Sequence, residues 1–171
     1  MTTNLPKNSK AFTLVETLIA IAILLVAVVG PIGLIGNAVH NLYYARDEMV
    51  AINLAQEGIE VVRQMRDSNM LSAGTWDFGF DGPNYVVDVG NATSQLSAIT
   101  SDQVVYLDST TGLYRQINNG YTPTQFSRLI TTTNASLGTS ERQITSTVKW
   151  RTGGSATGTI SVSENLFKWA I

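Results

Sequence analysis

The sequence contains an uninterrupted apolar stretch from Leu18 to Gly36, without a charged or strongly polar side chain. At a helical rise of about 1.5 Å per residue, this stretch spans roughly 28 Å, close to the ~30 Å hydrocarbon core of a bilayer. A short leader with Lys7 and Lys10 and no acidic residue precedes it. Because positive charge tends to stay in the cytoplasm, we expect a single membrane span followed by an exported C-terminal part.

One carboxylate, Glu16, stands at the beginning of the apolar segment. A charge at mid-bilayer costs about 2.5–3.5 kcal/mol on insertion scales, and such residues usually have a function. A helix N-terminus also favours an acidic residue, but that effect is smaller, at about 0.3–1 kcal/mol. The sequence therefore predicts a cationic partner for Glu16, with a helix-terminus preference as the simpler alternative.

The order Lys-Ala-Phe-Thr-Leu-Val-Glu over residues 10–16, followed by the apolar run, resembles the class III signal of type IV pilins and type II secretion pseudopilins. The resemblance implies a cleavage site formed by Lys10, Ala11 and Phe12, with the cut before Phe12 and methylation of its new amine. Family members usually have glycine before the cut, and Ala11 is another small residue. The resemblance further implies that Glu16 takes part in filament assembly, with the amine of Phe12 as its nearest cationic partner.

The same resemblance implies a structural filament subunit rather than an enzyme. Its partners would be a prepilin peptidase and methyltransferase, other pilin subunits, an inner-membrane assembly platform and, before assembly, membrane lipid. The protein would lie in the inner membrane and reach the periplasm or cell surface in a filament. The later run Asn53–Arg63 is similar to the post-membrane helix of minor pilins and I-type pseudopilins.

Three other interpretations compete with this one. An ordinary secretory signal, cut near Gly36–Ala38, has an apolar core of about 7–15 residues, shorter than the one here. A plain single-pass anchor explains the length but neither the leader nor Glu16. A membrane-anchored binding module that never polymerises is the alternative function.

Gly30 and Pro31 interrupt the apolar run. Proline removes one helical N–H and clashes with the carbonyl four residues back, so we expect a kink or local loosening there. The resemblance implies that this segment can lose helical structure when subunits pack into a filament.

Residues 37–70 are predicted to continue the helix as an amphipathic half. Apolar residues at spacings of three and four form two adjoining stripes, namely Ile52, Ala55, Ile59 and Val62, and Leu54, Gly58, Val61 and Met65. Arg63 is spaced to pair with Glu60 and with Asp67. We expect the helix to end near Asp67–Asn69. A connecting loop over 71–84 then follows, with its aromatic side chains packed onto the helix.

Residues 85–171 are predicted to form an antiparallel sheet. The strand candidates are Tyr85–Val89, Val104–Asp108, Leu113–Ile117, Phe126–Thr132, Gln143–Arg151 and Thr157–Trp169. Asp108–Gly112 and Thr152–Gly158 are hairpin signals. The expected fold is α+β and type IV pilin-like, with four to six antiparallel strands on one long helix. The expected division is leader 1–11, membrane or filament-core helix 12–36, amphipathic helix 37–70, loop 71–84 and sheet 85–171.

Composition excludes several kinds of chemistry. The 171 residues include no cysteine, and the formal net charge of −2 comes without a basic block for nucleic acid. The single histidine, His40, lacks an evident catalytic or metal-binding partner, so we interpret it as a surface or interface residue. The loop acids Asp77, Asp81, Asp102 and Asp108 are too few and too dispersed for calcium and are interpreted as solvated turn residues. We expect no cofactor and no metal.

Overall fold

The computed structural model describes residues 12–72, 75–80, 83–88, 97–98, 103–134, 140–153 and 156–168. The chain forms two compact units, Met1–Leu42 and Tyr43–Ile171. One helix, α1 (Leu14–Leu71), contributes to both, and seven strands belong to the second unit. The strands are β1 (Asn84–Val86), β2 (Ser97–Ala98), β3 (Gln103–Leu107), β4 (Tyr114–Arg115), β5 (Thr122–Asn134), β6 (Glu141–Thr152) and β7 (Ala156–Phe167).

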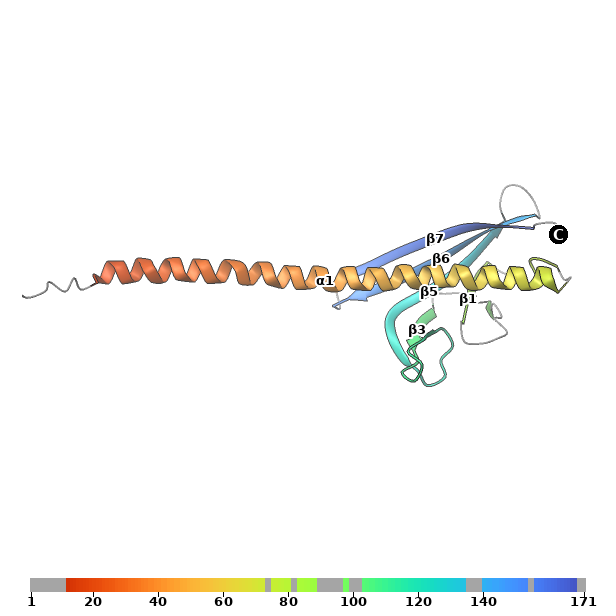
Figure 1. Ribbon diagram of the computed structural model, residues 1–171, viewed down its shortest axis with the longest axis horizontal. Helices are drawn as coiled ribbons and strands as arrows, with labels where there is room; N and C mark the ends of the chain where they lie inside the picture. Colours follow the sequence, from red (N-terminus) through yellow and green to blue (C-terminus); the bar gives the residue numbers. More distant parts are fainter. Residues whose placement is uncertain are drawn as a thin grey trace, which may run out of the picture. The chain divides into compact units, whose positions relative to one another are not determined.

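The strands form a single antiparallel sheet, which confirms the predicted α+β architecture. The three longest strands, β5, β6 and β7, lie side by side, and β6 pairs with both neighbours over most of its length. The other edge of β5 pairs with β3 near its start and with β1 near its end. Figure 1 shows β6 and β7 on one side of α1 and β1 and β3 on the other, so that the sheet wraps around the helix.

The predicted strands correspond to β1 and β3–β7, with shifted ends. The expected strand Leu113–Ile117 is reduced to the two residues of β4, whereas the expected Phe126–Thr132 grows to the thirteen residues of β5. The two-residue strand β2 was not predicted, since its pairing with β1 leaves no periodic pattern in so short a segment. Both hairpins are confirmed, and Gly112 and Gly153 occupy positive φ angles of 72° and 58° in their turns.

The helix buries most of the predicted stripes against this sheet, while Ile52 and Met65 are only partly buried. Its buried residues are Asp47, Ala51, Leu54, Ala55, Gly58, Ile59, Val61 and Val62. The helix ends at Leu71, two residues beyond the expected segment. Arg63 pairs with Glu60 as predicted, but Asp67 bonds Arg66, with 2.6 Å between Nε and Oδ1. The second guanidinium contact of Arg63 is instead to Glu164 on β7, at 2.6 Å.

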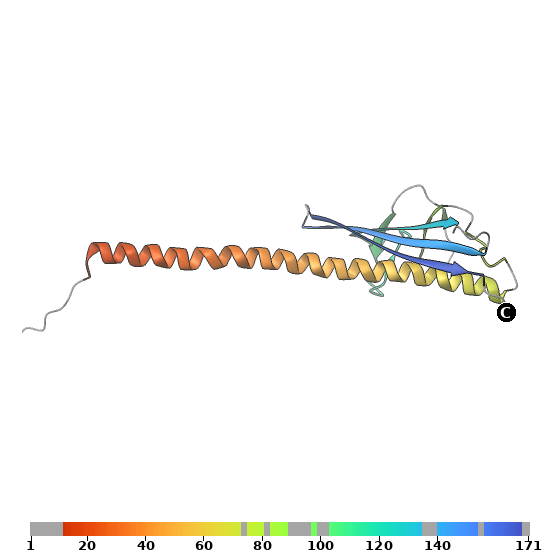
Figure 2. The same ribbon diagram turned by 90° about the horizontal axis from the view of Figure 1, so that it is seen from above.

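Two apolar clusters form the core. The first joins Ile59 and Val62 of α1 to residues of the loop, β1, β5, β6 and β7, among them Trp76, Phe80, Tyr85, Ile130, Ile144 and Leu166. The second joins Ala51, Leu54 and Ala55 to Val105, Phe126, Val148 and Trp150. Figure 2 shows the three long strands running lengthwise along the C-terminal half of α1. Both clusters therefore lie between this helix and the long strands.

Two of the three aromatic side chains of the loop after α1, Trp76 and Phe80, pack into the core as expected, but the expectation is wrong for Phe78, which is 72% exposed. Trp76 and Phe80 are 4% and 1% exposed, and Asn69 donates hydrogen bonds to the carbonyls of Trp76 and Phe78. The interpretation of Asp77 as a solvated turn residue is wrong. Its carboxylate accepts two hydrogen bonds from Arg142 of β6, at 2.7 and 3.1 Å, because the loop folds back over that strand.

Candidate functional site

The start of α1 carries the candidate site, and Thr13 caps it. The hydroxyl oxygen of Thr13 accepts a hydrogen bond from the Glu16 N–H at 3.3 Å, and its carbonyl accepts one from the Thr17 N–H at 3.2 Å. A threonine followed three residues later by glutamate is the spacing of a capping box, in which the glutamate side chain can return to the cap residue. This T-x-x-E pattern was present in the sequence, yet the role of Thr13 was not predicted.

Glu16 lies in the first turn of α1 with its side chain exposed. Among the described residues, no cation pairs with its carboxylate. Phe12, four residues earlier, is 75% exposed. Lys10 and Ala11, the other members of the predicted cleavage site, lie outside the described residues, so cleavage and the pairing of Glu16 stay predictions.

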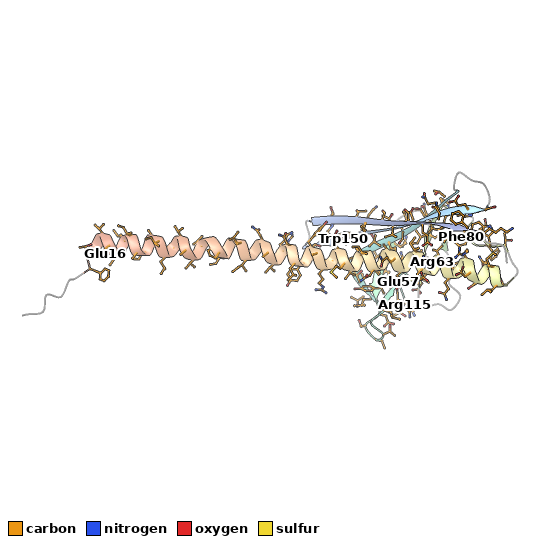
Figure 3. All side chains as sticks on the ribbon, turned by 45° about the horizontal axis from the view of Figure 1, so that its top comes forward. Glu16, Glu57, Arg63, Phe80, Arg115 and Trp150 are labelled. Carbon is orange, nitrogen blue, oxygen red and sulfur yellow. The ribbon has the colours of Figure 1, made fainter. Side chains whose placement is uncertain are left out.

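The surface of α1 after Glu16 is apolar around its whole circumference. The large apolar side chains of this segment, from Phe12 to Leu42, have between 44% (Val39) and 76% (Leu14 and Val26) of their surface accessible. Figure 3 shows these side chains projecting on all sides of the helix beyond Glu16. The helix is long and apolar enough to cross a membrane. A continuous apolar surface of this extent requires lipid or other protein chains around it.

The helix assignment continues through Gly30 and Pro31 without a break. The kink or loosening expected there therefore stays a prediction. An added Cβ at Gly30 would meet no heavy atom within 4 Å, so nothing within the described chain crowds this position.

The second unit has an open cleft of about 780 Å³ on the face of the sheet that points away from α1. Ser127, Lys149 and Thr159 face one another across β5, β6 and β7 and line it, together with Arg151 and Thr157. No acid or histidine is among the lining residues that the structure describes. The cleft thus has cations and hydroxyls but not the nucleophile–base pair of a hydrolytic site.

The other sequence candidates do not gather into a site. His40 is exposed on α1, as expected for a surface residue. Asp108 is 6% exposed, so its interpretation as a solvated residue is wrong: it holds the β3–β4 turn through Thr110 and Thr111. Asp81 and Asp102 lie outside the described residues. Within the described ranges, no three His, Cys, Asp or Glu side chains are grouped to hold a metal ion.

The geometry defines an α+β protein with an N-terminal helix suited to a membrane anchor. Residues 6–30 match the family model described as the prokaryotic N-terminal methylation motif. This motif is the signature of type IV pilins and pseudopilins, and it supports a pilin-like protein that a prepilin peptidase processes. No curated protein and no solved structure matches the chain.

Proposed function

We propose that this protein is a structural, non-enzymatic subunit of a type IV pilus-like or type II secretion pseudopilus filament. The methylation motif supports this function, because it begins at residue 6 and ends within the apolar helix at residue 30. The apolar surface of that helix is the second support. Lipid covers it before assembly, and the helices of neighbouring subunits cover it in the filament, so one surface serves both environments.

The proposed order of events begins in the inner membrane. A prepilin peptidase cuts between Ala11 and Phe12 and methylates the amine of Phe12. Residues 12–36 then form the membrane and later the filament core, while residues 37–171 are exported to the periplasm or cell surface. An assembly platform in the inner membrane transfers the subunit to the fibre, and Gly30 and Pro31 allow the helix to loosen as subunits pack.

Glu16 supplies the docking charge in this proposal. The carboxylate has no cationic partner among the described residues, and a charge in lipid is unfavourable without one. The amine of Phe12 on a neighbouring subunit neutralises it, which removes two unfavourable charges at once and sets the axial position of the incoming subunit. Methylation keeps the positive charge of that amine.

The cleavage step is tested on the mature protein by N-terminal sequencing. We expect the mature chain to begin Phe-Thr-Leu-Val-Glu, and Ala11→Gly to be processed at least as well. A mature N-terminus near Val39 would identify an ordinary secretory signal and would refute the filament proposal. Replacing Ala11 with a bulky residue should block the cut.

The cap formed by Thr13 gives a sharper test of Glu16. Glu16→Gln removes the charge and keeps a residue that a capping box accepts, whereas Thr13→Ala removes the cap and keeps the charge. We expect both variants to be inserted and cleaved, and only Glu16→Gln to be depleted from sheared filaments relative to the membrane fraction. Depletion of Thr13→Ala with normal assembly of Glu16→Gln would show that Glu16 only helps to begin the helix.

A membrane-anchored binding module that never polymerises is the alternative function. It predicts cleavage and membrane insertion but no protein in a sheared filament fraction. Electron microscopy of that fraction with peptide identification separates the two functions. Cleavage without any filament would support the binding module.

A further inference from the structure

The chain enters the second unit at Tyr43, and the end of β6 lies beside that entry point. The rings of Tyr44 on α1 and Trp150 on β6 have their centroids 5.9 Å apart. Two residues further on, the Thr152 hydroxyl donates a hydrogen bond to the Asp47 carboxylate at 2.7 Å. Figure 3 shows Trp150 at this end of the sheet. Residues 43–48 and 149–152 are called the entry end below.

The arginines of the protein divide into two groups. Five of them pair with a carboxylate at 3.9 Å or less, namely Arg63, Arg66, Arg115, Arg128 and Arg142. The other two, Arg46 and Arg151, are exposed and form no ion pair among the described residues. Both of them belong to the entry end. The guanidinium groups without a carboxylate are therefore gathered where the chain enters the second unit.

On the sheet side, the entry end continues into the open cleft of about 780 Å³. Lys149, two residues before Arg151, is exposed and also lines this cleft. The lining hydroxyl residues Thr157 and Thr159 lie opposite Arg151 and Lys149 in the ladder between β6 and β7. Cations and hydroxyl donors, without an acid among the described lining residues, suit an anion with several oxygen acceptors. A phosphate group is such an anion.

The acids of the entry end do not cancel its positive charge. Asp47 is 8% exposed, and its carboxylate is occupied by the Thr152 hydroxyl. Glu48 on α1 is half-buried. Three cations against two carboxylates leave the entry end positive, although the whole chain has a formal net charge of −2. The sign of the local charge is therefore opposite to that of the protein.

The entry end follows directly on the apolar surface of α1. Exposed apolar side chains continue beyond the apolar run to Leu42 and Tyr43, which are 67% and 54% exposed. Tyrosine is enriched at membrane–water interfaces. From Tyr43 to Asp47 the helix rises about 6 Å, and the polar headgroup layer is about 5–7 Å thick on each side of a bilayer. An interface at Tyr43 would therefore place the entry end at the level of the lipid phosphates.

We infer that the entry end binds the phosphate groups of anionic phospholipids in the membrane that holds α1, through Arg46, Lys149 and Arg151. Cations beside an anionic bilayer are attracted to it within a Debye length, about 10 Å at 0.1 M salt. The inference rests on the membrane anchorage and export in the proposed function, but not on filament formation. Its consequence is that the second unit is held at the membrane surface before assembly and releases lipid phosphates when it enters a filament.

A single fluorescent label can report on this contact, because the natural chain has no cysteine. Thr157→Cys places the label opposite Arg151, and Ser163→Cys places it further along the same face of β7. The full chain is reconstituted in nanodiscs whose lipids carry a headgroup quencher, with phosphatidylcholine alone or with one third phosphatidylglycerol. We expect stronger quenching at position 157 in the anionic lipid, loss of that difference at high salt, and little quenching at position 163.

Two glutamine variants of the Thr157→Cys chain provide a matched pair. Arg151→Gln and Lys168→Gln each remove one exposed positive charge, but Lys168 follows the opposite end of β7. Arg151→Gln should lower the ratio of quenched to unquenched label about fivefold, and Lys168→Gln less than about twofold. Arg46→Gln should act like Arg151→Gln, because a bilayer surface reaches both the helix and the sheet. The fluorescence of the buried Trp150 checks that each variant is folded.

Four results would overturn this inference while leaving the proposed function intact. They are equal quenching in the two lipids, equal effects of Arg151→Gln and Lys168→Gln, relief of the quenching by added glycerol phosphate, and quenching that requires two chains in one nanodisc. The third would identify a soluble phosphate ester as the ligand, and the fourth a neighbouring chain. A chain that does not stay with the nanodiscs at all would refute the membrane anchorage, and with it both the proposed function and this inference.

Discussion

The guanidinium of Arg128 on β5 and the carboxylate of Glu57 on α1 form an ion pair of 2.9 Å between the two apolar clusters. Arg128 is fully buried and also donates to the carbonyls of Leu54 and Val87 and to the side chain of Gln116. Burial lowers the pKa of Arg128 from its ordinary value, and the Glu57 carboxylate opposes that shift. This one side chain links α1, β5 and the segments around β1 and β4.

Arg128→Met should therefore be among the most destabilising single changes in the second unit. It removes the hydrogen bonds that Arg128 donates to the carbonyls of Leu54 and Val87 and leaves Glu57 without its cation, which should cost about 3–5 kcal/mol of unfolding free energy. Urea unfolding of the full chain in micelles, followed by tryptophan fluorescence, measures this loss. Glu57→Gln should cost less, about 1–2 kcal/mol, because glutamine still accepts a hydrogen bond.

Glu60→Gln, the same substitution about one helical turn further along α1, is the control for Glu57→Gln. Glu60 is largely exposed and pairs with Arg63 on the surface, so Glu60→Gln should cost at most about 1 kcal/mol. If Glu60→Gln and Glu57→Gln cost the same, the ion pair between Arg128 and Glu57 adds nothing beyond a surface contact.

Gly58→Ala should destabilise the protein although alanine is the better helix former. The added Cβ would lie 2.7 Å from the Ser146 hydroxyl oxygen and 2.8 Å from Ile130 Cδ1. Overpacking of this kind costs about 1–3 kcal/mol, which exceeds the gain of about 1 kcal/mol in helix propensity. The midpoint of urea unfolding should fall.

Ser146→Ala tests the cause of that loss. The Ser146 hydroxyl is buried without a hydrogen-bond partner among the described groups, so its removal alone should be neutral or stabilising. Combined with Gly58→Ala it should restore part of the lost stability, because one of the two close contacts disappears. Additive effects of the two substitutions would place the strain elsewhere.

Asp108 should contribute stability that depends on pH. The Thr111 hydroxyl and the Thr110 N–H donate to its carboxylate and hold its pKa below the ordinary value of 3.8. Because the folded pKa is lower than the unfolded one, the contribution is complete above pH 3.8 and disappears as the pH falls through the folded value. The difference in thermal midpoint between the native protein and Asp108→Asn should shrink over that window. A constant difference would contradict the assignment.

Asp77→Asn should release the loop after α1 without unfolding the core. The change weakens two charge-assisted hydrogen bonds to Arg142, at an expected cost of about 1–3 kcal/mol. Amide exchange in residues 75–80 should accelerate, while exchange in β6 stays slow. Equal acceleration in both segments would mean that the loop and the sheet open together.

The features that could be predicted from the sequence were those that depend only on residues close together in the chain. The apolar run 18–36, the amphipathic stripes of α1, the aromatic loop and the turn Asp108–Gly112 each follow from a local period or turn chemistry. The candidate site at Phe12 and Glu16 is local in the same sense. Its one missed member, Thr13, was available from the T-x-x-E spacing.

The tertiary structure alone decided which distant residues meet. Arg128 and Glu57 are 71 positions apart, and Arg63 and Glu164 are 101 apart. An arginine in an alternating strand predicts a solvated face, and only the wrapping of β5 around α1 buries Arg128 instead. The order of the strands in the sheet likewise cannot be predicted from any short segment, because strands with similar alternating patterns could pair with one another in several orders. Among the described strands, β7 pairs with β6 alone, and this too depends on the strand order of the whole sheet rather than on the sequence of β7.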